Sequence, residues 1–195
     1  MLMLAKVGLY ERDIFVSGEW RSSHAASFIS GCTAMKPAPG TTQSTPPRNI
    51  FMWQAIQLAA SNKQRPFAAV IADRETGLVA ASGTNRVQDH PLWHAEIDAI
   101  NQLACSSFVI TDTPSLYTTA EPCPMCFSAI LWTGITEVVF GTSISRLTDF
   151  GWRQIPIEAD EINSRASVLQ CDVFGGVLQQ ETDLLFAAGP NSVVR

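Results

Sequence analysis

The stretch AEPCPMC, residues 120–126, places two cysteines three positions apart. The residues before it, SLYTTA (115–120), favour a strand, and CFSAILWTG (126–134) favours a helix that ends at Gly134. A Cys-x-x-Cys pair is typical either of a redox couple or of half a metal site. The other potential ligands in the chain decide between these two interpretations.

The segments on both sides of this unit alternate between helix and strand patterns. Upstream we expect a helix from residue 49 that stops before Pro66, a hairpin of residues 67–73 and 78–85, and a helix over residues 94–104. Downstream we expect a strand at 136–142, an irregular turn at 146–155, a helix at 158–168, a short strand near Cys171 and a last helix at 178–188. This alternation predicts an α/β sandwich.

Two expectations about the core depend on apolar character and spacing. In the first helix, Ile50, Trp53 and Ile56 recur at a spacing of three to four residues, which predicts that they face the core. Trp132, near the end of the helix that follows the cysteines, is also expected to be a core residue.

Residues 1–47 differ from the rest of the chain. They lack a clean periodicity and end in KPAPGTTQSTPP (36–47), a composition typical of linkers. We therefore expect an irregular N-terminal extension over residues 1–47 and one folded domain over residues 48–195.

The composition excludes several classes of protein. With 46% hydrophobic and 16% charged residues, the chain can bury a substantial core. Five cysteines, scattered except for one pair, are not a disulfide framework, so we expect a reducing compartment, the cytoplasm. No apolar run approaches the roughly 18 residues of a membrane span. The net charge of −5 does not favour nucleic acid, and no Lys or Arg lies between Arg86 and Arg146.

A further set of ligands lies in WHAEIDAI, residues 93–100. His94, Cys123 and Cys126 together offer one imidazole and two thiols, a set that suits zinc. Cysteines in the first turn of a helix are favoured as thiolates by the helix dipole. Three protein ligands leave a fourth position for water, which is the pattern of a catalytic zinc. Such a zinc ion supplies hydroxide by lowering the pKa of its water.

Glu96 lies two residues after His94 and is free to carry protons. As a general base it would take a proton from the water, and as a general acid it would protonate a ring nitrogen and the departing amine. The alternative is a structural zinc site or thiol pair, closed by a fourth ligand from Cys105, Cys171 or His90. That alternative leaves Glu96 without a function.

Three further residues are candidates for contact with a substrate. Asn85 follows a strand and offers an amide donor and acceptor, although a turn residue is an equally simple interpretation. Phe67 would stack on a base or pack in the core, and Trp93 would line the pocket or pack beside His94.

The pattern His94-Ala95-Glu96 followed by Pro122-Cys123-Pro124-Met125-Cys126 resembles the H-x-E…P-C-x-x-C signature of zinc nucleobase deaminases. The resemblance to this cytidine-deaminase-like superfamily extends over residues 51–186. Its nearest likeness is to the bacterial branch of guanine deaminases and tRNA adenosine deaminases. It implies a three-layer α/β/α sandwich with a five-stranded mixed sheet, a homodimer, and one zinc ion per subunit.

The resemblance also implies roles in substrate binding. Asn85 and the backbone N–H of Ala95 would orient the base, and Phe67 and Trp93 are further candidates. The guanine deaminase branch has an acidic or aromatic segment that closes over the base, for which Asp149, Phe150 and Trp152 are candidates.

These features predict a zinc-dependent hydrolase that releases ammonia from a purine base or nucleoside, with guanine as the first choice. The alternative within enzymes is tRNA adenosine-to-inosine deamination, disfavoured by the scarcity of cations. The alternative from another class is a non-catalytic, zinc-stabilised binding module. We expect a small-molecule purine as partner, with no nucleic acid and no membrane.

Overall fold

The structure is a computed structural model that describes residues 15–16, 19–20, 48–106, 113–167 and 169–190. The chain divides into two compact units, Met1–Thr41 and Thr42–Arg195. In the first unit, β1 (Phe15–Val16) pairs antiparallel with β2 (Glu19–Trp20). The rest of the extension that we expect to be irregular lies outside the described residues.

The second unit is built on a five-stranded mixed sheet in the order β4-β3-β5-β6-β7. Strand β3 is antiparallel to both of its neighbours, whereas β5, β6 and β7 are parallel to one another. The strands are β3 (Ala68–Asp73), β4 (Val79–Thr84), β5 (Pro114–Ala120), β6 (Glu137–Thr142) and β7 (Asp172–Phe174). Helices connect the parallel strands, as such crossovers require.

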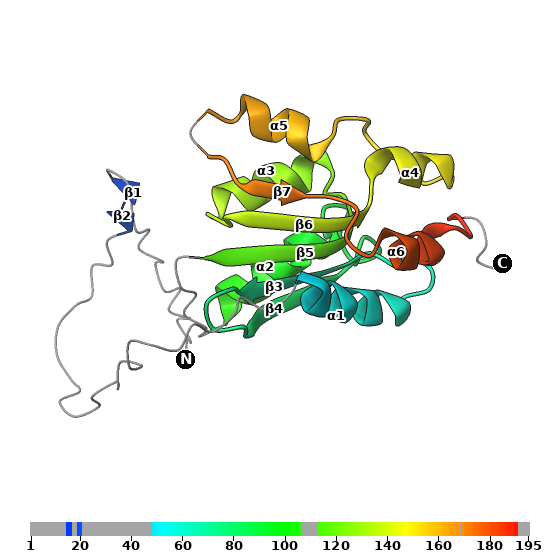
Figure 1. Cartoon of the computed structure of the whole chain (residues 1–195), viewed down its shortest axis with the longest axis horizontal. Helices are drawn as coiled ribbons and strands as arrows, with labels where there is room; N and C mark the ends of the chain where they lie inside the picture. The colour runs from blue at the N-terminus through cyan, green and yellow to red at the C-terminus, as the bar shows by residue number, and fades with distance from the viewer. Residues whose placement is uncertain (1–14, 17–18, 21–47, 107–112, 168, 191–195) are drawn as a thin grey trace, which may run out of the picture. The chain divides into compact units, whose positions relative to one another are not determined.

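Helices cover both faces of this sheet (Figure 1). They are α1 (Arg48–Ala60), α2 (Ala95–Cys105), α3 (Pro124–Trp132), α4 (Ile144–Asp149), α5 (Ala159–Arg165) and α6 (Gln179–Phe186). The alternation of side chains along each strand divides the core: Val70 and Tyr117 pack under α1, while Ile71 and Leu116 belong to the cluster under α2 and α3. This arrangement confirms the expected three-layer α/β/α sandwich.

Helix α2 lies unusually close to the edge strand β4 because β4 contains Gly83. A Cβ atom at this position would collide with the backbone of Ala95 and Ala99. The glycine therefore sets the depth of the first turn of α2, which carries His94 and Glu96 at its start.

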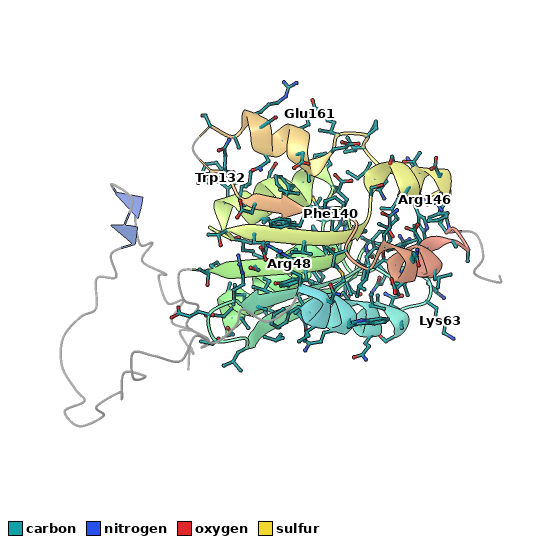
Figure 2. All side chains as sticks on the ribbon, in the orientation of Figure 1. Arg48, Lys63, Trp132, Phe140, Arg146 and Glu161 are labelled. Carbon is teal, nitrogen blue, oxygen red and sulfur yellow. The ribbon has the colours of Figure 1, made fainter. Side chains whose placement is uncertain are left out.

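The core expectation for α1 is confirmed at Ile56 and wrong for the other two residues, and that for Trp132 is wrong. On α1 the buried residues include Phe51, Met52 and Ala55, whereas Ile50 and Trp53 are nearly half exposed. The helix is apolar around most of its circumference, so spacing alone did not identify its buried face. Trp132 is 79% exposed on the outer side of α3 (Figure 2).

The irregular turn expected at 146–155 is partly wrong as well, because α4 occupies its first residues. Ser143 caps this helix by accepting a hydrogen bond from the amide of Arg146. Gly151, with a φ of 86°, lies just after its end. Helix α4 has only six residues, too few to give a periodic signal. Among the described residues, every helix is too short or too polar to span a lipid bilayer.

Candidate active site

His94 immediately precedes α2 and has an extended backbone. Its carbonyl accepts the amide of Asp98 at 2.9 Å, so the helix begins directly after the imidazole. Ala95 is the first helical residue and Glu96 lies in the first turn. The local sequence thus places a potential ligand and a carboxylate side by side at one helix start.

Cys123 holds the equivalent position before α3. Strand β5 ends at Ala120, and Pro124 is the first residue of α3, where its fixed φ is compatible with a helix start. The carbonyl of Cys123 accepts the amide of Phe127 at 2.9 Å, and Cys126 is buried in the first turn.

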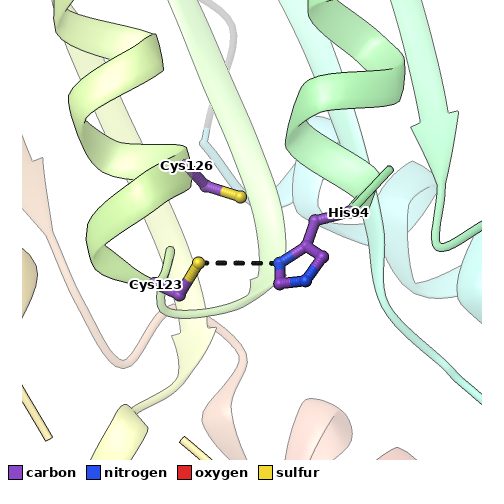
Figure 3. A group of neighbouring side chains, drawn as sticks. All are labelled: His94, Cys123 and Cys126. Carbon is purple, nitrogen blue, oxygen red and sulfur yellow. Dashed lines mark hydrogen bonds between the residues drawn. The ribbon is translucent and has the colours of Figure 1, made fainter. Parts of the chain in front are cut away.

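Figure 3 shows the imidazole of His94 and the thiols of Cys123 and Cys126 pointing toward one another. The three ligand atoms all lie within 4.8 Å of each other. Cys123 Sγ and His94 Nδ1 are 3.5 Å apart. A tetrahedral zinc ion with usual Zn–N and Zn–S bonds requires an N···S separation of about 3.5 Å. Both the donor set and this spacing fit zinc, as the sequence predicts.

The two thiols are strongly coupled. The hydrogen bond with Cys126 lowers the pKa of Cys123 to about 4, and the hydrogen bond with His94 acts in the same direction. The same contact with Cys123, followed by burial, raises the pKa of Cys126. The lowered pKa of Cys123 favours its thiolate, and zinc binding would release the proton of Cys126.

The described part of the chain does not supply a fourth protein ligand. Among the described residues, the cluster of potential ligands contains His94, Cys123 and Cys126 alone. Cys105 is exposed, and the amide of Leu92 donates to His90 Nδ1 while the ring of His90 packs against Trp93. The site therefore has the open form typical of catalytic zinc.

Glu96 is buried beside these ligands. Thr118, on β5, donates a hydrogen bond to Glu96 Oε1 at 2.9 Å. Burial raises the pKa of Glu96, and the hydrogen bond from Thr118 partly opposes this shift. The hydrogen bond from Thr118 thus helps to fix the orientation of the carboxyl group.

A cavity of about 130 Å³ opens at the side of the ligands. Its walls include His94, Glu96 and Cys123. Two aromatic side chains, Phe67 and Trp152, form another part of the wall and meet edge to face with ring centroids 5.1 Å apart. This volume is below the roughly 300–1,000 Å³ of pockets for drug-sized ligands, and it suits a single heterocycle.

The other residues predicted to bind substrate occupy different positions. Asn85 lines the cavity, and its Oδ1 accepts the amide of Val87 at 3.3 Å. Ala95 is fully buried at the helix start. Trp93 is absent from the cavity lining; its ring instead lies under the guanidinium of Arg86, 4.6 Å from the centroid.

Several cavity residues were not among the residues that the sequence predicts to bind substrate. Gln154 and Arg153 follow Trp152 along the wall, and Arg65 lines it from the turn after α1. Of the three candidates after β6, only Trp152 lines the cavity, while Phe150 packs against the guanidinium of Arg146. Residues 87–145 contain no Lys or Arg, but two arginines from outside this stretch therefore line the cavity.

Glu121 is a further cavity residue that the sequence did not predict, although it lies within the stretch AEPCPMC, residues 120–126. It is buried, and its carboxylate accepts hydrogen bonds from two backbone amides. A carboxylate next to a metal-binding cysteine was the available signal.

Comparison with known proteins agrees with this geometry. The family described as the cytidine and deoxycytidylate deaminase zinc-binding region matches residues 47–142. A tRNA-specific adenosine deaminase of Rickettsia bellii is 31% identical over 134 residues, covering 66% of this chain and 88% of the relative.

Two other relatives carry different names. A probable cytosine deaminase of Schizosaccharomyces pombe is 34% identical, covering 56% of this chain and 67% of the relative. A guanine deaminase of Bacillus subtilis is 33% identical, covering 52% of this chain and 69% of the relative. The relatives thus share a chemistry and differ in substrate.

Solved structures share the fold. The protein NE0047, solved in complex with 2,6-diaminopurine, superposes with a TM-score of 0.66 and 26% identity, covering 76% of this chain and 85% of that protein. Together with the ligand set and the relatives, this likeness leads to one conclusion. The chain belongs to the cytidine deaminase family and is a zinc-dependent hydrolase that acts on C–N bonds of nucleobases or nucleosides.

Proposed function

We propose that this enzyme deaminates a free purine base, with guanine as the preferred substrate. The observation that carries the proposal is the small cavity beside Glu96, with aromatic walls at Phe67 and Trp152. A planar heterocycle matches both the volume and the aromatic lining.

Within this proposal, His94, Cys123 and Cys126 hold the zinc ion. When bound, zinc acts as a Lewis acid that allows water to attack a ring carbon at neutral pH. Glu96 accepts a proton from the attacking water and delivers it to the adjacent ring nitrogen. Glu96 would then take the remaining proton from the hydroxyl group added to the ring carbon and give it to the departing amine, so that ammonia leaves and a carbonyl remains. The hydrogen bond from Thr118 fixes the carboxyl group during both transfers.

Substrate orientation in this proposal depends on polar groups at the cavity wall. The amide of Asn85 would pair with the purine edge, since the Val87 amide already fixes the orientation of its Oδ1. The N–H of Ala95, in the first turn of α2, is one of those that a helix leaves unpaired, and it would orient the base. Phe67 would contact the ring face, whereas Trp93 would act indirectly by supporting the loop before His94.

A second candidate function is deamination of adenosine in tRNA. Arg65 and Arg153 favour it, because both line the cavity and neither has an ion-pair partner among the described residues. Such cations would suit a phosphate backbone. The small cavity and the net charge of −5 favour the free base.

One experiment separates these candidates. The zinc-loaded protein is incubated with guanine, guanosine, adenine, adenosine, cytosine, cytidine and an anticodon stem-loop, and ammonia or inosine is measured. We expect turnover of guanine. Turnover of the RNA alone would replace the proposal with the second candidate. No turnover with zinc bound would favour a non-catalytic zinc module.

We also propose that the enzyme is a cytoplasmic homodimer whose catalytic domain spans residues 48–195. Exposed Trp132 and the apolar groove beside it, formed by residues of α3 and α5 with Leu169, support a contact face of this kind. The free state of the four described cysteines agrees with a reducing compartment. Light scattering of the full chain tests the dimer, and a monomeric mass would exclude it.

A further inference from the structure

Glu121 links the end of β5 to two helices that are distant in sequence. Its Oε2 accepts the amide of Ile144 at 2.7 Å, and its Oε1 accepts the amide of Ala159 at 2.8 Å. Ile144 and Ala159 are the first residues of α4 and α5. A carboxylate is well suited to both, because the first amides of a helix lack partners within it and carry partial positive charge.

The segment between these two helix starts forms part of the cavity wall. Trp152, Arg153 and Gln154 line the cavity from this segment. Trp152 is held from its other side, since its Nε1 donates to the carbonyl of Phe186 at 3.0 Å. Glu121 thus binds the first and the last residue of the segment 144–159. The middle of this segment lines the same cavity as Glu96.

We infer that Glu121 is a positioning residue that sets the substrate-binding wall at Trp152 through α4 and α5. The inference rests on the proposed function in one respect, that deamination takes place in this cavity. Because each carboxylate oxygen accepts an amide N–H, the side chain of Glu121 is fixed in place between the two helices. Its effect falls on how tightly the base is held.

The test combines Glu121→Gln with steady-state kinetics on whichever base the substrate panel identifies. Glutamine keeps the shape but turns an NH₂ group toward one of the two amides, so one bond is lost. We expect KM to rise about tenfold while kcat changes by less than about threefold and zinc content stays the same. An unchanged KM, or a loss confined to kcat, would overturn the inference.

Two further variants separate positioning from general stability. Glu137→Gln changes another fully buried carboxylate, at the opposite end of the sheet, and should leave KM unchanged. Ala159→Pro removes the donor to Oε1, because proline has no N–H and is tolerated at the first position of a helix, and it adds two ring carbons at a fully buried position. The preceding Glu158 already has the extended backbone that proline requires. This variant should raise KM even if Glu121→Gln fails to fold.

Hydrogen exchange provides a readout without any substrate. In Glu121→Gln, amides of residues 144–159 should exchange faster than in the wild type, whereas those of β3 and β5 should not. Faster exchange in Glu121→Gln would support the positioning role of Glu121 even if the wild type does not turn over guanine. That combination would reject guanine as the substrate and keep the role of Glu121. Unchanged exchange in this segment would overturn the role itself.

Discussion

Buried carboxylates lie at both ends of the sheet, and their partners differ in kind. At the start of β6, Glu137 forms ion pairs with Arg48 at 2.7 Å and Arg74 at 3.1 Å. Beyond the opposite ends of the parallel strands, Glu96 and Glu121 accept hydrogen bonds from a hydroxyl and from backbone amides.

The difference indicates which end carries chemistry. The carboxylate of Glu137, paired with two arginines, links α1 and the hairpin to β6 and so contributes to the fold. A buried carboxylate such as Glu96, whose pKa is raised by burial and which has no cation paired with it among the described residues, is suited to gain and lose a proton. Ligands of α/β sheets bind at the carboxyl ends of parallel strands, the end where Glu96 and the cysteines lie.

The largest effect is expected from removing a zinc ligand. Cys126→Ser should abolish both zinc binding and turnover, because the hydroxyl is a poor replacement for a soft thiolate. Zinc that binds only the folded protein stabilises it. Chelation should therefore lower the melting temperature of the wild type and of Glu137→Gln, while that of Cys126→Ser stays insensitive. A chelator response in Cys126→Ser would contradict the ligand assignment.

The next largest effect belongs to Glu96. Glu96→Gln should retain zinc and lose activity by about 10³-fold, since general acid–base catalysis contributes about 10²–10⁴. The matched change at the other end, Glu137→Gln, should retain activity and lower the free energy of unfolding by about 1–3 kcal/mol. Kinetics, zinc analysis and urea unfolding of both variants check this contrast. Activity retained in Glu96→Gln would remove Glu96 from the mechanism.

A smaller effect is expected at the cavity wall. Asn85→Ala should raise KM for the substrate about tenfold, the effect of losing one hydrogen bond worth roughly 1.4 kcal/mol. Asn163→Ala is the control, because the side chain of Asn163 hydrogen-bonds the backbone of Cys171 and does not line the cavity. Equal KM values for the two variants would exclude a substrate contact at Asn85.

The smallest effect concerns alkaline stability at the structural end. Burial, followed by the nearby charge of Glu137, raises the pKa of Tyr117 to about 12. In the unfolded chain a tyrosine ionises near pH 10. The stabilisation is therefore complete below pH 10 and is lost as pH rises from 10 to 12. Tyr117→Phe should weaken this decline in unfolding experiments, and an identical pH profile would show that Tyr117 does not cause it.

The zinc ligands and the order of elements could be predicted because they depend on local patterns. His94 and Cys123 each precede a helix whose start is encoded within a few residues. The buried face of α1 could not be predicted, because Phe51 and Ile50 are both apolar and only the sheet selects between them. Trp132 was misjudged for a related reason, since hydrophobicity does not distinguish a core from a contact surface.

The cavity wall could not be predicted, because distant segments form it. Arg65 and Trp152 lie 87 positions apart in the sequence and become neighbours of the same cavity only through the fold. The role of Glu121 likewise depends on amides at positions 144 and 159, and backbone amides leave no trace in a residue pattern.

The bridge at Glu121 also bears on how this enzyme could be redesigned. Residues 145–158 are enclosed between two helix starts bound by one side chain. The segment between α4 and α5, residues 150–158, can therefore be varied between these fixed ends without altering the strand or helices that carry the zinc ligands. Libraries that vary Trp152 and its neighbours, and keep Glu121, would search new substrates while the hydrolytic machinery stays constant.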